Sequence, residues 1–380
     1  MRIALFTDTF VPEVNGVART LKRFTDFLDK KQIEYKVFAP ETPDKDLFAA
    51  HIHRFTSFRF FLYPECRIAL PNIMQIKEEL QKFKPHLVHV ATPFNMGLCG
   101  LHFAKKLQIP IVGSYHTDFD QYLHYYDLQF LSKLLWRYMH WFHRPLQKIF
   151  VPSQTTLEQL KRHGFTNLHI WPRGVDCSLF HPHYNKQEIR EKYQIHEKYL
   201  FVYVGRIAAE KDVHLLPQIA KQLPESVKND VHWLIVGDGP LKEKLQQDIP
   251  DNMTFVGYLH GEELAKTYTA ADIFVFPSAT ETFGNVVLES LASGTPVIGA
   301  DSGGVKNIVE HGKFGYLCEP GNVESFVHAI LQCLLSNAKI KQMGLDGRAY
   351  ALTQNWDSIF EELLAQYEEV IRRSPYVLYA

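Results

Sequence analysis

The chain has few cysteines, and none is arranged for a metal or redox site. The 380 residues include five, far apart along the sequence: Cys66, Cys99, Cys177, Cys318 and Cys333. An odd number of dispersed thiols, with no Cys-x-x-Cys, supports neither a disulfide framework nor a zinc site. We expect buried or idle thiols in a reducing compartment.

Long apolar runs are also missing. No stretch of about 18 apolar residues occurs, which excludes a transmembrane helix. The apolar start Met1–Phe6 gives way to Thr7 and Asp8 and is too short for a signal peptide. We therefore expect a soluble, cytoplasmic protein that is at most peripheral on the inner face of the cell membrane.

The common nucleotide-binding fingerprints are absent as well. No Gly-Lys-Ser/Thr occurs, so a P-loop is excluded. The nearest approach to a dinucleotide fingerprint, Gly237 to Lys242, has a lysine where the third glycine is needed. The sequence therefore disfavours both dehydrogenases and P-loop enzymes.

Charge is abundant but divided between the two halves. The net charge is −1, yet residues 1–175 carry 23 Lys and Arg against 15 Asp and Glu, while the remainder carries 18 against 27. The near-neutral total charge gives no reason to expect nucleic acid as a binding partner. A basic half joined to an acidic half suggests two domains with different partners.

Short apolar runs alternate with amphipathic stretches in both halves. The expected strands are Ile3–Phe6, Tyr35–Phe38, Leu87–Val90, Ile109–Gly113 and Ile149–Val151, then Tyr199–Val204, His232–Val236, Met253–Val256, Ile273–Phe276 and Pro296–Ile298. This alternation predicts the α/β class, with two Rossmann-like, doubly wound domains facing across a cleft. We place the first domain at 1–172, a linker at 173–198 and the second domain at 199–355. A helix in 356–380 packs on its own domain or crosses back to the first.

The densest local signal runs from Pro277 to Gly294. A strand ends before it, and a helix is expected to begin near Gly284 or Asn285. The unpaired amides of a helix start form an anion site. Glu281 precedes that start and Glu289 follows on the second turn, so both carboxylates could accept hydrogen bonds from ligand hydroxyls. The alternative is two solvated glutamates on a surface helix.

Three further features follow expected strands. Arg206 and Lys211 are suited to neutralising a diphosphate, although basic residues at strand ends are often only solvated. Asn15 and Gly16 open a helix after the first strand and allow close approach of a phosphate. His116 either bonds a sugar hydroxyl or caps its own loop.

Together these features resemble glycosyltransferase family 4, retaining enzymes of the GT-B architecture, over nearly the whole chain. The motifs are Glu-x7-Glu at Glu281 and Glu289, Gly-Arg-x4-Lys at Arg206 and Lys211, the Asn15-Gly16 loop and Arg173–Pro182. The segments Tyr63–Pro71, Ser114–Leu123 and Leu135–His143 are similar to GDP-mannose-dependent lipid mannosyltransferases and to sulfoquinovosyl transferases that glycosylate diacylglycerol.

The resemblance implies a role for each residue. Glu289 would hold the donor ribose, and Glu281 the donor hexose. The hexose would also meet the amides of Phe283, Gly284, Asn285 and Val286. Arg206 and Lys211, with Asn15 and Gly16, would bind the diphosphate, and His116 would lie beside the transferred sugar. The catalytic set is then His116, Arg206, Lys211 and Glu281, with no cofactor and no metal required.

The resemblance leaves the substrates open. We favour transfer of mannose from GDP-mannose to an acceptor hydroxyl on a lipid or glycolipid. One alternative is a UDP-hexose-dependent transferase, glucosyl or related, acting on diacylglycerol or another acceptor. Two readings from other classes are a nucleotide-sugar epimerase, which would turn over without acceptor, and a non-catalytic sensor.

A basic helix marks the expected acceptor side. Residues Gln129–Lys148 predict a helix with Lys133, Arg137 and Arg144 on one stripe beside apolar side chains. Such a stripe suits an interface with anionic lipid, although a core helix with a solvated basic face is equally consistent. We assign the acceptor or membrane side to Asp118, Lys133, Arg137, Arg144, Phe60 and Phe61.

Overall fold

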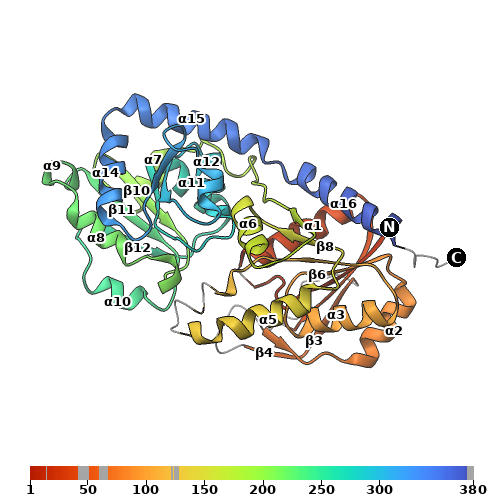
Figure 1. Ribbon diagram of the computed structural model, residues 1–380. Helices are drawn as coiled ribbons and strands as arrows, with labels where there is room; N and C mark the ends of the chain where they lie inside the picture. Colours follow the sequence, from red (N-terminus) through yellow and green to blue (C-terminus); the bar gives the residue numbers. More distant parts are fainter. Residues whose placement is uncertain (14, 42–50, 60–66, 121–122, 124–127, 375–380) are drawn as a thin grey trace. The chain divides into compact units, whose positions relative to one another are not determined.

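The computed structural model describes residues 1–13, 15–41, 51–59, 67–120, 123 and 128–374. Its contacts divide the chain into two compact units, which are shown in Figure 1 and are considered one at a time. The first consists of Met1–Leu123, Leu128–Pro172 and Asp357–Ala380, and the second is essentially Arg173–Trp356.

The first unit is built on a seven-stranded parallel sheet in the order β3-β2-β1-β6-β7-β8-β9. Its strands are β1 Arg2–Phe6, β2 Glu34–Pro40, β3 Ile52–Phe55, β6 Leu87–Val90, β7 Ile111–Ser114, β8 Lys148–Val151 and β9 Leu168–Ile170. An antiparallel pair, β4 Ser57–Arg59 and β5 Arg67–Ala69, stands apart from this sheet. The order of the strands reverses between β1 and β6, and ligands of such folds bind at that point.

Helices follow the strands of this sheet, as parallel pairing requires. They are α1 Gly16–Lys30, α2 Ile73–Phe83, α3 Asn95–Lys106, the 3-10 turn η1 Gln129–Leu131, α5 Ser132–His143, α6 Gln154–Arg162 and, at the end of the chain, α16 Trp356–Arg373. Asn15 caps α1 by accepting a hydrogen bond from the amide of Ala18. Asparagine is a preferred cap because its side chain satisfies an otherwise unpaired amide.

The helix α16 packs on the first unit (Figure 1). Its Phe360 is 1% exposed and meets the ring of Phe24 at 5.2 Å. Lys148, which is buried in β8, pairs with Glu369 at the other end of the helix. An apolar anchor and a half-buried ion pair therefore hold α16 in place.

The second unit has a six-stranded parallel sheet in the order β12-β11-β10-β13-β14-β15. The strands are β10 Tyr199–Val204, β11 Val231–Val236, β12 Met253–Gly257, β13 Ile273–Phe276, β14 Val297–Ala300 and β15 Gly315–Cys318. The helices are α7 Lys186–Lys192, η2 Ala209–Lys211, α8 Leu215–Gln222, α9 Glu225–Lys228, α10 Lys242–Gln246, α11 Gly261–Ala270, α12 Asn285–Ala292, α13 Val305–Ile308, α14 Val323–Leu334 and α15 Asn337–Thr353. Here the order reverses between β10 and β13.

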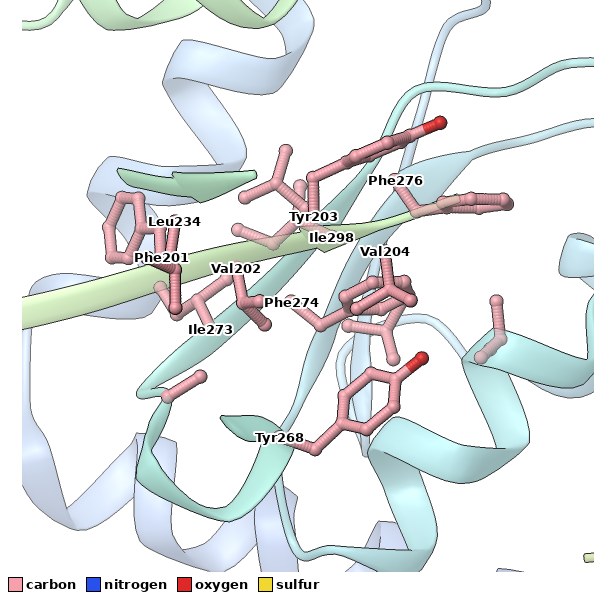
Figure 2. Close-up of a cluster of buried hydrophobic side chains, with 14 of the residues drawn as sticks. Phe201, Val202, Tyr203, Val204, Leu234, Tyr268, Ile273, Phe274, Phe276 and Ile298 are labelled. Carbon is pink, nitrogen blue, oxygen red and sulfur yellow. The ribbon is translucent and has the colours of Figure 1, made fainter. Parts of the chain in front are cut away.

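Aromatic and aliphatic side chains pack together in the core of the second unit (Figure 2). Tyr203 and Phe276, on the adjacent strands β10 and β13, stack at 5.9 Å, and Tyr268 of α11 meets Phe274 edge-on. Both tyrosines are fully buried, and a buried hydroxyl requires a partner. The Tyr203 hydroxyl donates to the carbonyl oxygen of Arg206, and the Tyr268 hydroxyl donates to the carboxylate of Glu289.

The fold class expected from the sequence is confirmed, and two boundaries differ. The helix expected over Gln129–Lys148 ends at His143, because Pro145 follows and Lys148 already begins β8. The segment 173–198, expected as a linker, packs into the second core through Val175, Phe180, Ile189 and Ile195. Within the described ranges, no helix is both long and apolar enough to span a membrane.

The anchoring of α16 gives a first prediction. Replacing Phe360 with alanine empties a buried site in the first unit and should lower the free energy of unfolding by about 3–5 kcal/mol. Leu345→Ala, at a position that is 55% exposed, should change it by less than about 0.5 kcal/mol. Urea unfolding followed by tryptophan fluorescence measures both, and equal effects would contradict the anchoring role.

Candidate active site

Two loops meet at the reversal point of the second sheet. One follows β10 and contains Arg206 and Lys211, and the other follows β13 and contains Glu281. Because β10 and β13 are adjacent and parallel, both loops leave the sheet at the same edge. The strand polarity alone therefore brings the basic motif and the first glutamate of the acidic motif to one place.

Three contacts join the two loops. The Lys211 ammonium lies 2.5 Å from a carboxylate oxygen of Glu281, and both side chains are mostly buried. The Thr280 hydroxyl donates to the carbonyl oxygen of Glu210 at 2.7 Å. The Ala279 amide donates to the carboxylate of Asp212. Lys211 and Glu281 are thus held in register by neighbouring backbone contacts, and their pairing neutralises two charges that would be costly to bury singly.

Arg206 is oriented by a buried carboxylate. Its guanidinium donates to Glu210, four residues later, whose side chain is completely buried. The carbonyl of Arg206 accepts a hydrogen bond from the Tyr203 hydroxyl at 3.0 Å, and burial raises the pKa of that hydroxyl well above 10. The bond to Glu210 sets the direction of the guanidinium, which has five N–H donors.

The helix α12 begins as the sequence predicts. Gly284 precedes it with φ of 100°, a left-handed conformation that favours glycine, and Asn285 is the first helical residue. Phe283 is buried, whereas Asn285 and Val286 are half-buried at the helix start. The backbone bends here because Gly304, after β14, donates its amide to the carbonyl of Glu281 at 2.6 Å.

Glu289 lies on the second turn of α12 and is half-buried. The hydroxyl of Tyr268, from the core in Figure 2, donates to its carboxylate at 3.2 Å. The acidic motif is therefore not a pair of solvated surface glutamates. Each of its carboxylates has a specific partner from another element, Lys211 for Glu281 and Tyr268 for Glu289.

The first unit places its own predicted residues at its reversal point. Asn15 ends the connection from β1, and Gly16 is the first residue of α1. The amide nitrogen of the Asn15 side chain donates to Thr9. Beside them Asp8 is completely buried at the end of β1. Its carboxylate accepts from the Met96 amide at the start of α3 and from the Thr92 hydroxyl. The Asp8 carboxylate therefore fixes the loop after β6 to the loop after β1.

His116 lies two residues after the end of β7. Its Nε2 lies 2.7 Å from the hydroxyl oxygen of Ser114, the last residue of that strand. Asp118, two residues on, is buried and accepts a hydrogen bond from Gln159 of α6. The loop that presents His116 is thus tied down on both sides of the histidine.

The basic helix α5 is exposed along one stripe. Lys133, Arg137 and Arg144 are exposed, and Arg144 follows the last helical residue. The same region exposes Leu134 and Trp141 at 64% and 59%. Phe60 and Phe61 lie outside the described residues. A face with cations and large apolar side chains side by side differs from an ordinary solvated face.

The described part of the chain contains no group of three metal-ligating side chains. The four cysteines within it are unbonded, and burial raises the pKa of Cys318 and Cys333 to about 12. Such thiols are unreactive at neutral pH.

The chain matches known proteins over its whole length. It is 32% identical to a GDP-mannose-dependent alpha-mannosyltransferase of Mycolicibacterium smegmatis, over 98% of each chain. The family models for group 1 glycosyl transferases and for glycosyltransferase family 4 match residues 185–350 and 14–179. The chain belongs to glycosyltransferase family 4. It is an enzyme, a hexosyltransferase.

Other relatives of this glycosyltransferase agree. A sulfoquinovosyl transferase of Arabidopsis thaliana is 34% identical over 90% of the chain and 68% of that protein. Sucrose-phosphate synthase from Thermosynechococcus elongatus, at 21% identity, covers 98% of this chain and all of that one with a TM-score of 0.82. The structural match identifies the GT-B fold.

Sequence reasoning misses one buried carboxylate in each unit. Asp8 precedes the Asn15-Gly16 motif and Glu210 lies between Arg206 and Lys211, but their complete burial depends on partners distant in sequence or on the path of the loop. A carboxylate between a strand end and a helix start was the available signal, since such residues often accept from helix amides.

Asp8 provides a prediction for pH dependence. Burial raises the pKa of Asp8 from its usual 3.8 to about 6, against the lowering effect of its hydrogen bonds to Thr92 and Met96. The folded state then holds more protons than the unfolded state between these values. The free energy of unfolding should therefore fall by roughly 3 kcal/mol as pH rises from about 4 to about 6, and level off above.

Asp8→Asn should remove this part of the pH dependence. The asparagine can donate to Thr92 while still accepting from Met96, so the loops stay joined. Urea unfolding of both proteins across the pH range measures the difference. Asp26→Asn, at an exposed pair with Lys22, should keep the wild-type slope. An unchanged slope in the Asp8 variant would show that another group titrates.

Proposed function

We propose that this glycosyltransferase moves mannose from GDP-mannose to a hydroxyl of a lipid or glycolipid, with retention at the anomeric carbon. The ion pair of Lys211 and Glu281, held at the reversal point of the second sheet, is the observation that carries the proposal. The pair joins a cation to a carboxylate that precedes α12, and this supports a site for an anion and for hydroxyl groups. The mycolicibacterial relative supports GDP-mannose as the donor.

The chemistry depends on charge that develops on the leaving diphosphate. Arg206 and Lys211 would stabilise this charge together with the amides at Asn285 and Val286, which point out of the start of α12. Glu281 would hold the hexose hydroxyls, Glu289 the ribose, and His116 the transferred sugar. In this proposal no metal is required, because the two side-chain cations and the helix terminus supply the positive charge.

Retention then needs no carboxylate nucleophile. The departing phosphate oxygen would accept the proton of the acceptor hydroxyl. That hydroxyl would attack the anomeric carbon on the same face from which the phosphate leaves. The protein's contribution is orientation and charge stabilisation, which together account for large parts of enzymatic rate enhancement.

A second donor is favoured by a separate observation. The similarity to a sulfoquinovosyl transferase, at 34% identity, supports a donor sugar other than mannose. The alternative that we propose is a UDP-hexose-dependent transferase acting on diacylglycerol or another acceptor. A panel of nucleotide sugars separates the two donors by thermal stabilisation. The true donor, at about 100 times its Kd, should stabilise the folded chain by roughly 2.7 kcal/mol.

Variants of the ion pair test the transfer itself. Lys211→Ala should lower kcat by at least about 100-fold, since it removes a cation from the leaving group. Glu281→Gln should lower kcat/KM by about 10-fold or more, because hydrogen bonds to a carboxylate are the stronger ones. Both proteins should remain folded but less stable than the wild type, because each variant leaves one mostly buried charge without its partner.

The control is a matched pair on the surface of the same unit. Lys313→Ala and Glu310→Gln remove an ion pair whose side chains are 54% and 59% exposed, and should leave transfer unchanged. Radiolabelled transfer to a lipid extract measures all four variants. Near-full activity of Lys211→Ala or Glu281→Gln would show that the assigned roles are wrong, and release of an altered donor without acceptor would indicate an epimerase.

We also propose that the exposed stripe of α5 docks the first unit on an anionic membrane surface, which would make the protein peripheral on the cytoplasmic face. Each Lys or Arg near such a surface contributes about 1 kcal/mol. Replacing Lys133, Arg137 and Arg144 by glutamine should therefore lower partitioning to anionic vesicles by roughly 100-fold. Trp141→Ser should weaken binding even at high salt, because the apolar contribution is not screened.

Vesicle flotation at low and high salt measures this partitioning. Replacing Lys306 and Lys313, both in the second unit, should have no comparable effect. Failure of the wild-type protein to bind anionic vesicles at low salt would remove the proposal.

A further inference from the structure

A chain of buried hydrogen bonds joins the C-terminal helix to His116. We infer that this chain, from Tyr367 of α16 through His89 and Ser114, fixes the tautomer and orientation of His116 and so makes Tyr367 a positioning residue for sugar transfer. The inference rests on the role proposed for His116. It assigns to α16 a function beyond packing.

The geometry of the chain is continuous. The Tyr367 hydroxyl lies 2.5 Å from Nδ1 of His89, and Nε2 of His89 lies 2.9 Å from the Ser114 hydroxyl. That hydroxyl is in turn 2.7 Å from Nε2 of His116. His89 and Ser114 come from the adjacent strands β6 and β7, and Tyr367 comes from α16. All three are within hydrogen-bonding distance of their neighbours.

Burial makes the chain costly to leave incomplete. Tyr367 and His89 are 0% exposed, and Ser114 is 3% exposed. An unsatisfied buried donor or acceptor costs about 1–3 kcal/mol, so every proton must have an acceptor. The order of donors is therefore determined by the residue at the buried end.

Tyr367 is that end. Burial raises the pKa of its hydroxyl well above 10, so the hydroxyl keeps its proton and donates it. Among the described residues its acceptor is Nδ1 of His89. His89 must then carry its proton on Nε2, which donates to the Ser114 oxygen.

The same logic fixes His116. The Ser114 oxygen already accepts from His89, so its own proton is directed to Nε2 of His116. Neutral His116 then carries its proton on Nδ1. The imidazole can offer an N–H donor, and not a lone pair, to a sugar hydroxyl on its Nδ1 side.

Packing prevents the rings from turning away. Trp171 is 2% exposed and contacts His89 at 5.8 Å and His116 at 5.7 Å between ring centroids. Phe24 and Phe150 meet the Tyr367 ring at 6.1 and 5.8 Å. A phenylalanine at 367 would satisfy this apolar packing equally well, so packing alone does not explain the hydroxyl.

The first test reads the tautomer directly. In the full chain labelled with 15N-histidine, His116→Gln identifies the His116 signals. We expect a protonated Nδ1 and an accepting Nε2 in the wild-type protein near neutral pH. Tyr367→Phe and Ser114→Ala should both shift these signals toward a mixture of tautomers.

Tyr35→Phe is the matched control. Tyr35 is 5% exposed, and its hydroxyl donates to Asp29, which is not part of the hydrogen-bond chain that reaches His116. This variant should leave the His116 signals unchanged. A wild-type His116 protonated on Nε2, or signals unchanged in Tyr367→Phe and Ser114→Ala, would overturn the inference.

The second test is kinetic. Tyr367→Phe and Ser114→Ala should lower kcat by about 10-fold, because small misplacements at a reacting centre are costly. The KM for the nucleotide sugar should change by less than about 2-fold, since ground-state binding is retained. In the His116→Gln background, Tyr367→Phe should lower kcat no further, because it acts through His116.

The outcomes separate this inference from the proposed function. Equal losses from Tyr367→Phe with and without His116 would indicate a merely structural role and overturn the inference. If the wild-type enzyme transfers sugar, an unchanged kcat in Tyr367→Phe would also overturn the inference. If the wild-type protein transfers sugar from no nucleotide donor, the proposed function fails, and the tautomer measurement still decides whether the chain positions His116.

Discussion

The site depends on one constraint of parallel sheets, that neighbouring strands end at the same edge. In the second unit this brings the loop after β10 to the loop after β13, where Lys211 pairs with Glu281. The pair lies where the strand order reverses, the point at which the helices on either side diverge and leave room for a ligand. Motifs seventy residues apart in sequence become one site because the strands before them are neighbours.

The pairing has an electrostatic consequence. In the structure the positive charge of Lys211 is balanced by Glu281 and that of Arg206 by Glu210. Under the proposed function, an arriving diphosphate would meet cations that are already oriented and partly neutralised. Lys211 would exchange one anionic partner for another, and Glu281 would be released toward a hydroxyl-bearing ligand. A donor with both a diphosphate and a hexose would then satisfy both members of the pair, whereas an inorganic anion would satisfy one.

Much of this could be predicted from the sequence, because the signals are local. Continuous apolar runs marked β6, β10 and β13 to the residue, and the glycine before Asn285 marked the start of α12. The edge strands β9 and β15 gave little signal. No residue of β9 is buried, and β15 begins with a glycine, so neither forms a continuous apolar run. The Tyr367–His89 bond joins residues 278 positions apart, and the periodicity of α16 could indicate only which face is buried. Tertiary packing, not local pattern, selects such partners.

The C-terminal helix shows why a polar side chain in a core needs its own explanation. Phe360 and Tyr367 lie on the same buried face of α16, and the burial of both rings provides the adhesion. The hydroxyl adds a net 0.5–1.5 kcal/mol or so at best, and it obliges His89 and Ser114 to be polar too. Three polar groups in an aromatic core conflict with simple packing, and such conflicts are typical of functional sites. Here the polar groups form one hydrogen-bonded line that ends on His116. The core loses some apolar contact, and in return the line fixes the orientation of the His116 imidazole.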